Sequence, residues 1–236
     1  MTMKRIQLQK SFFTSPIAFG FNLLLVYIVY GLCRLAYLFE NWSVLSEGFD
    51  KLSFWEAFKG CWMFDTSAIL YTNALYAILM LLPLHVKETD WWQNMAKWIY
   101  ITVNSLCIIA NLSDAVYFQY TGRRTTTSVF QEFSNEGNIA DVMGVEVLRH
   151  WYLVLTGILL IAGLIALYAK PAGEFRLRTQ KDYLRYYITH LVCFGLYIPI
   201  TICGMRGGAT TAVRPMTLSN ANQYVNTPTE AAIVLN

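Results

Sequence analysis

The chain has 236 residues, of which 56% are hydrophobic, 15% are aromatic and only 14% are charged. A typical soluble domain carries roughly 25% charged and 45–50% apolar residues, so this composition excludes an ordinary soluble domain. The formal net charge of +3 is small and says little as a total, because in a membrane protein the informative quantity is the side on which Lys and Arg lie. We expect an integral membrane protein whose partners are membrane lipids and not nucleic acid.

Five apolar segments follow one another along the chain, and blocks such as Ile188–Met205 contain no charged residue. About 20 apolar residues in a helix cross the roughly 30 Å of bilayer hydrocarbon. In lipid such a segment must be helical, because an isolated strand would leave its backbone groups unpaired. The sequence therefore predicts an all-α fold, a polytopic bundle of about five transmembrane helices within residues 1–205, at 16–39, 60–84, 95–117, 151–169 and 186–205.

The segment 121–149 is too hydrophobic for a free loop. Apolar residues such as Phe130, Phe133, Ile139 and Val142 recur along it, and hydroxyls at 125–127 could cap a helix. We expect one or two short amphipathic helices there, on the outer membrane surface. A connector that folds over the bundle would fit the same pattern.

The tail 206–236 begins with a polar, glycine-containing stretch that predicts an extended chain outside the membrane. It ends on the apolar run Ala231–Leu235, which has no further sequence to pack against. We interpret the tail as an extracytoplasmic linker toward a missing domain.

Basic residues predict the orientation. The loop Arg176–Arg185 is compact and basic, and loops of this kind resist translocation. We therefore expect a cytoplasmic amino terminus and, after five spans, an extracytoplasmic carboxyl terminus.

Four charged residues lie within or beside the predicted spans and share a depth near their outer ends: Arg34, Asp65, Asp114 and Arg206. Charge inside lipid costs about 2.5–3.5 kcal/mol on insertion scales and usually has a partner. One explanation is structural, with Arg34 paired to an aspartate. The other is a basic cup, completed by Arg123 and Arg124, that holds an anionic lipid head group.

Other polar residues suggest little chemistry. Asn73, Asn104 and Asn111 lie inside spans and are expected to form interhelical hydrogen bonds. His85 and Glu88 have helical spacing but no third ligand, and no phosphate loop or catalytic triad pattern is present. We expect no catalytic residue, metal or cofactor in this chain.

Three stretches resemble the amino-terminal membrane domain of the lipoteichoic acid synthase family, the membrane-anchored phosphoglycerol transferases and their sulfatase-like relatives. They are Gly60–Tyr71, Asn111–Phe118 followed by Arg123 and Arg124, and Arg206–Gly208 with Arg214–Ala221. The resemblance covers nearly the whole chain in order and spacing.

The resemblance implies a five-helix anchor in the bacterial cytoplasmic membrane, then a linker and an extracytoplasmic catalytic domain. That domain would use a threonine nucleophile and a divalent metal to move phosphoglycerol from phosphatidylglycerol. The sequence stops at Asn236, roughly where the domain would begin, so any catalysis belongs to the missing part. The candidate lipid-binding or bracing residues carried over are Asp65, Asp114, Arg123, Arg124, Arg206 and Arg214.

Two other functions fit parts of the sequence. A non-enzymatic lipid-binding or regulatory membrane protein would use the same basic cup. A small transporter is less well supported, because the sequence has no internal repeat and its ionisable residues gather at one face instead of the midplane.

Overall fold

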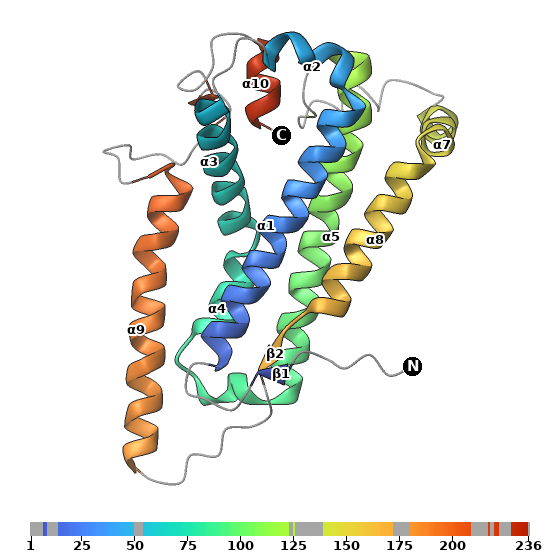
Figure 1. Cartoon of the computed structure of the whole chain (residues 1–236). Coiled ribbons are helices and arrows are strands. Elements are labelled where there is room, and N and C mark those ends of the chain that lie inside the picture. The colour runs from blue at the N-terminus through green and yellow to red at the C-terminus, as the bar shows by residue number, and fades with distance from the viewer. Residues whose placement is uncertain are drawn as a thin grey trace. The chain divides into compact units, whose positions relative to one another are not determined.

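The computed structural model describes residues 7–8, 14–49, 54–122, 125, 139–171, 180–208, 217, 220–221 and 228–235. Over these residues the fold is all-α, as predicted, apart from one pair of strands of two residues each (Figure 1). The helices are α1 (Thr14–Glu40), α2 (Trp42–Phe49), α3 (Phe54–Thr72), α4 (Ala74–Leu81), the 3₁₀ turn η1 (His85–Glu88), α5 (Asp90–Thr121), α7 (Ile139–Arg149), α8 (Trp151–Leu167), α9 (Gln180–Met205) and α10 (Pro228–Leu235).

Among the described residues, three helices are long and apolar enough to cross a membrane: α1, α5 and α9. The pair α3–α4 would make a fourth crossing if its two halves form one bent span. Helix α8 is also apolar but has 17 residues, and so it is shorter than the other candidates. The prediction of membrane-length helices is therefore confirmed, and the count of five stays a prediction.

The predicted span 60–84 is broken at Asn73, where the axes of α3 and α4 differ by 63°. The backbone there leaves helical geometry at φ −98° and ψ 11°. Its N–H and carbonyl nevertheless remain paired, with the Ile69 carbonyl and the Ala77 N–H. The bend therefore leaves neither of these backbone groups unsatisfied, as an apolar environment requires.

The chain divides into two compact units, each of which is described by itself. Unit 1 comprises Met1–Ile28, Trp62–Ser105 and Ala162–Thr217. Its core contains a cluster of three tyrosine rings, Tyr76, Tyr100 and Tyr168, with centroids 4.9–6.4 Å apart. The strands β1 (Gln7–Leu8) and β2 (Lys170–Pro171) pair in parallel in this unit.

Unit 2 comprises Val29–Cys61, Leu106–Ile161 and Leu218–Asn236. Helix α10 packs against α2 (Figure 1). Leu45 of α2 and Ile233 and Val234 of α10 are almost wholly buried. The sequence set this apolar run apart from the extended stretch before it and offered no later sequence for it to pack against. In the structure it packs against α2 of the same chain.

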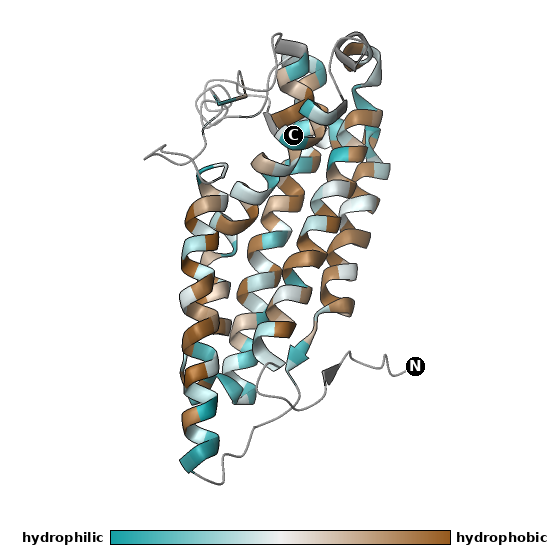
Figure 2. Cartoon of the chain, turned by 60° about the vertical axis from the view of Figure 1, so that its left-hand side comes forward, coloured by the Kyte–Doolittle hydropathy of each residue, from teal (hydrophilic) through white to brown (hydrophobic). Residues whose placement is uncertain are grey.

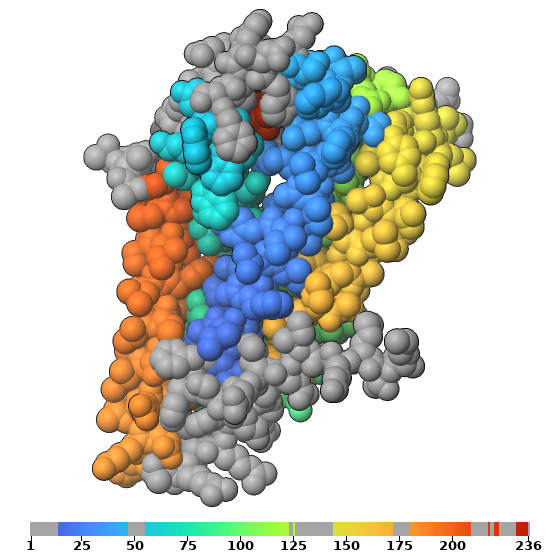
Figure 3. Space-filling model, viewed as in Figure 1, coloured from blue at the N-terminus to red at the C-terminus, as the bar shows by residue number. Residues whose placement is uncertain are grey.

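Helix α9 buries little of its apolar surface within unit 1. Only Tyr186 and His190 are buried along its length, whereas residues such as Leu191, Leu196 and Ile200 are exposed. Figure 2 shows this apolar stretch above a hydrophilic amino-terminal end, and Figure 3 shows α8 and α9 with their side chains at the surface. A helix that is apolar all round and faces outward is typical of a membrane protein.

Candidate functional site

Arg34 lies in α1 and reaches the carboxyl end of α10 in unit 2. Its Nη1 donates hydrogen bonds to the carbonyl oxygens of Ile233, at 2.9 Å, and Val234, at 3.2 Å. The Sγ of Cys61 in α3 lies 3.7 Å from the same Ile233 oxygen. The sequence predicted an aspartate or a lipid head group beside Arg34, and it gave no sign that two main-chain carbonyls would lie there.

Asp114 is buried in α5, also in unit 2, and its Oδ1 accepts a hydrogen bond from the backbone N–H of Thr125 at 2.6 Å. It thus holds the chain that leaves α5. Asn41, in the turn between α1 and α2, donates to the carbonyl of Ala115 at 3.0 Å. Both side chains brace connections near the end of α5, which supports a structural role for Asp114.

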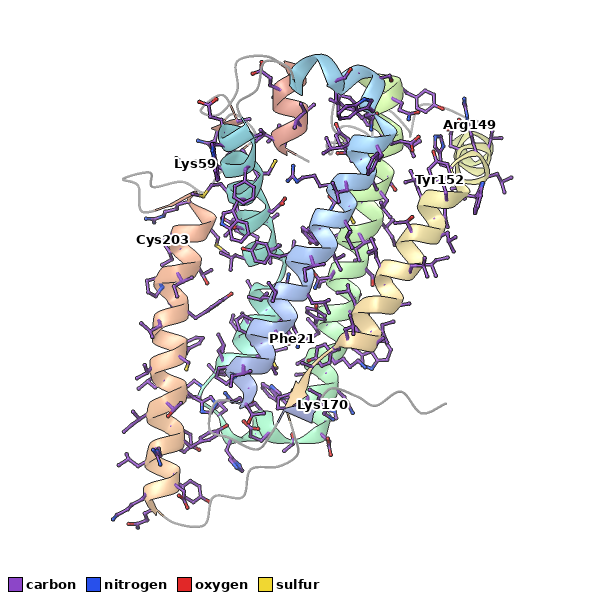
Figure 4. The ribbon with its side chains drawn as sticks, in the orientation of Figure 1. Phe21, Lys59, Arg149, Tyr152, Lys170 and Cys203 are labelled. Carbon is purple, nitrogen blue, oxygen red and sulfur yellow. The ribbon has the colours of Figure 1, made fainter. Side chains whose placement is uncertain are left out.

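Unit 2 also contains a polar cluster that the sequence did not predict, at the junction of α7 and α8. The ring nitrogens of His150 lie 3.4 Å from Oε1 of Glu40 and 3.3 Å from Oε2 of Glu146. Tyr152 donates to the Glu40 carboxylate at 2.7 and 2.8 Å, and Figure 4 shows it close to Arg149. The spacing of four between Glu146 and His150 was visible in the sequence, but Glu40 is more than 100 residues away.

Asp65 and Arg206 belong to unit 1. Asp65 is half-buried in α3, and Arg206 is exposed directly after α9. The predicted cup therefore draws Arg34 and Asp114 from unit 2 and Asp65 and Arg206 from unit 1. Arg123, Arg124 and Arg214 lie outside the described residues, and the cup stays a prediction.

A second buried polar group lies in unit 1, around η1. Glu88 Oε1 accepts hydrogen bonds from Ser15 at 3.0 Å and from Tyr186 at 2.9 Å. Lys87 is fully buried, donates to the Met80 carbonyl at 3.1 Å and lies 5.9 Å from the Tyr186 ring centroid. Burial lowers the pKa of Lys87 to about 8, because desolvation disfavours the charged amine. His85 contacts the Tyr186 ring instead of forming a metal pair with Glu88.

Asparagines join the helices of unit 1, as predicted for two of them. The amides of Asn73 and Asn104 exchange hydrogen bonds at 3.2 and 2.8 Å. Asn22 was not singled out from the sequence, yet its side chain pairs with both the N–H and the carbonyl of Ala169, at 2.9 and 3.0 Å. These contacts replace backbone pairing where α8 has ended, so the polar groups inside the bundle serve assembly.

No protein-family model, curated protein or solved structure matches this chain. Among the described residues, no group of three or more His, Cys, Asp or Glu side chains is placed to hold a metal ion. The polar contacts of the described residues brace helices and hold chain segments. This arrangement can position helices and bind segments of the chain.

Proposed function

We propose that this chain is the membrane-anchoring domain of a lipid head-group transferase or sulfatase-like hydrolase, similar to the lipoteichoic acid synthase family. Its task would be to hold an extracytoplasmic catalytic domain at the outer leaflet of a bacterial cytoplasmic membrane. The sequence stretches 60–71, 111–118 with Arg123 and Arg124, and 206–208 with 214–221 support the family assignment.

The packing of α10 on α2 is the observation that carries this proposal. A domain on a free tether samples a large volume, and its effective concentration at any one place is low. A domain that follows a packed helix starts from a fixed point, which favours encounter with a substrate in the same leaflet. The contact of Arg34 with the carbonyls of α10 adds to this fixation.

In the proposed membrane arrangement, α1, the bent pair α3–α4, α5, α8 and α9 make five crossings with the amino terminus inside. Exposed tryptophans near helix starts support it, namely Trp55 in α3, Trp91 in α5 and Trp151 in α8. Tryptophan prefers the membrane–water interface, where its ring is half in lipid and half in water.

Anionic lipid is the proposed ligand of this outer surface. Arg206 is exposed after α9, and Arg123, Arg124 and Arg214 are the further basic residues proposed to meet a phosphate there. A divalent metal and the threonine nucleophile would belong to the catalytic domain.

The test uses the full-length protein from its complete reading frame, reconstituted in vesicles that contain phosphatidylglycerol or phosphatidylethanolamine. Release of diacylglycerol is measured with Mn²⁺ and again after chelation with EDTA. We expect metal-dependent release, and we expect the catalytic domain cut away from its anchor to act at least tenfold more slowly on the same vesicles.

Two outcomes would contradict the enzyme proposal. One is a reading frame that ends after residue 236. The other is a full-length protein that retains phosphatidylglycerol through purification yet releases no diacylglycerol from either lipid. Either would favour the non-enzymatic lipid-binding protein.

A further inference from the structure

The carboxyl end of α10 presents carbonyl groups that its own helix cannot pair. The last four carbonyls of an α-helix lack an intrahelical partner, and Ile233 and Val234 are in the final turn. Both residues are almost wholly buried, with 2% and 0% of their surface exposed. Leaving such carbonyls unpaired away from water would be costly.

Arg34 needs hydrogen-bond acceptors, just as the carbonyls of α10 need a donor. It is a cation within a candidate membrane span, where a charged group needs a partner that can accept hydrogen bonds. The carboxyl end of a helix carries partial negative charge, and it favours a cation close to its last turn. One nitrogen of Arg34, Nη1, donates to two of these carbonyls, so the contact pairs the end of α10 and meets part of the requirement of the cation.

We infer that α1, α2 and α3 form a docking site for α10 in unit 2, and that Arg34 is its positioning residue. Arg34 caps the carboxyl end, Cys61 approaches the Ile233 carbonyl from α3, and α2 covers the side of the helix. These contacts hold α10 within unit 2. That the docking of α10 also fixes the segment leading to a catalytic domain rests on the proposed function.

The basic residues therefore fall into two groups. The Nη1 of Arg34 already donates to the carbonyls of α10, so a lipid phosphate would compete with them for this nitrogen. Arg34 is therefore assigned to α10, while Arg123, Arg124, Arg206 and Arg214 are left as candidates for lipid. Substitution of Arg34 should therefore change the order of α10 and should leave the retention of lipid unchanged.

The experiment measures hydrogen–deuterium exchange of residues 228–235 in the full chain held in lipid nanodiscs. We expect Arg34→Gln to speed exchange there at least tenfold, because it removes the charged donor. Arg34→Lys keeps a cation in the span but has a shorter reach, and about a threefold increase is expected. Lys59→Gln is the matched control, because Lys59 is an exposed basic residue of the same unit, labelled in Figure 4.

Exchange in residues 106–116 of α5 reports whether the unit is still folded. Unchanged exchange of 228–235 in a folded Arg34→Gln protein would overturn the inference. If the Arg34→Gln protein does not fold, the Arg34→Lys protein is the test. Exchange of 228–235 equal to wild type in that protein would also overturn the inference.

Lipid retention provides the second readout. Arg34→Gln should leave the phosphatidylglycerol that co-purifies, measured by mass spectrometry, within twofold of wild type. Loss of that lipid together with unchanged α10 exchange would assign Arg34 to the lipid and refute its docking role. Neither measurement depends on catalysis, so the docking can fail or hold separately from the proposed enzyme.

Discussion

Lys87 is a buried amine whose pKa is lowered from 10.5 to about 8 by desolvation. Between these two values the unfolded chain keeps the proton that the folded chain has lost, so the free energy of unfolding rises with pH. Below pH 8 the folded protein bears the full penalty of the buried charge, of order 3 kcal/mol at most.

We therefore predict that the melting temperature in detergent increases between pH 8 and pH 10 in wild type relative to Lys87→Met. The difference between the two proteins is the quantity to measure, since other groups titrate in this range. A constant difference across the range would show that Lys87 keeps an ordinary pKa.

Asn22 shows how a single amide can hold a chain segment. Its side chain pairs with both backbone groups of Ala169 and donates to the Tyr76 hydroxyl at 2.7 Å. Asn22→Leu would leave two buried backbone groups without these partners, and we predict a loss of about 3 kcal/mol. Thermal unfolding checks this, with Asn111→Leu, at a half-buried position of α5, as the control expected to lose less than about 1 kcal/mol. Equal losses of unfolding free energy in the two variants would show that Asn22 does not hold the segment at Ala169.

At the scale of elements, the apolar runs in the sequence located the helices well, but not their ends. The predicted span 95–117 became α5 at Asp90–Thr121, and the predicted 186–205 became α9 at Gln180–Met205. Hydropathy detects only the part of a helix that is apolar, whereas a helix can continue into polar sequence as long as its backbone bonds are kept.

Two elements could not be found from hydropathy. The bend at Asn73 interrupts a run that reads as one continuous span, since asparagine inside an apolar run indicates a hydrogen bond and not a break. Helix α10 has eight residues, too few for a stable isolated helix, so its formation depends on α2 and Arg34. Contacts that are distant in sequence decide the case of α10, and the same is true of Glu40 beside His150.

Gly204 of α9 lies against the side chains of Leu70 and Thr66 in α3. A Cβ atom added there would collide with the Leu70 side chain and lie 3.1 Å from Thr66 Cγ2, whereas one added at Gly195 has no neighbour within 4 Å. Small residues of this kind let membrane helices pack closely. We predict that Gly204→Leu destabilises the protein by about 1–3 kcal/mol and that Gly195→Leu is nearly neutral. Parallel thermal unfolding of the two variants tests this, and an equal effect would mean that α9 does not depend on the contact at Gly204.

At the scale of the whole molecule, α8 decides the number of membrane crossings. Its 17 residues extend about 26 Å as a helix, a few ångströms less than the roughly 30 Å of hydrocarbon. A short apolar helix can still span when the bilayer thins or flanking residues reach the interface. Trp151 at its start is 63% exposed and is suited to such an anchor.

Single-cysteine variants at Ser134 and Thr179 test this crossing directly, because α8 is the helix between the two positions that would separate them. In a background without the native cysteines, a membrane-impermeant maleimide applied to intact cells should label residue 134 and should label residue 179 only after the cells are opened. The five-crossing arrangement requires this result, since residue 134 follows α5 on the outside and the basic loop before α9 stays inside. Labelling of both positions in intact cells would mean that α8 lies along the membrane surface. Labelling of residue 179 alone would reverse the orientation and place the basic residues after α9 on the cytoplasmic side, away from the leaflet on which the proposed enzyme acts.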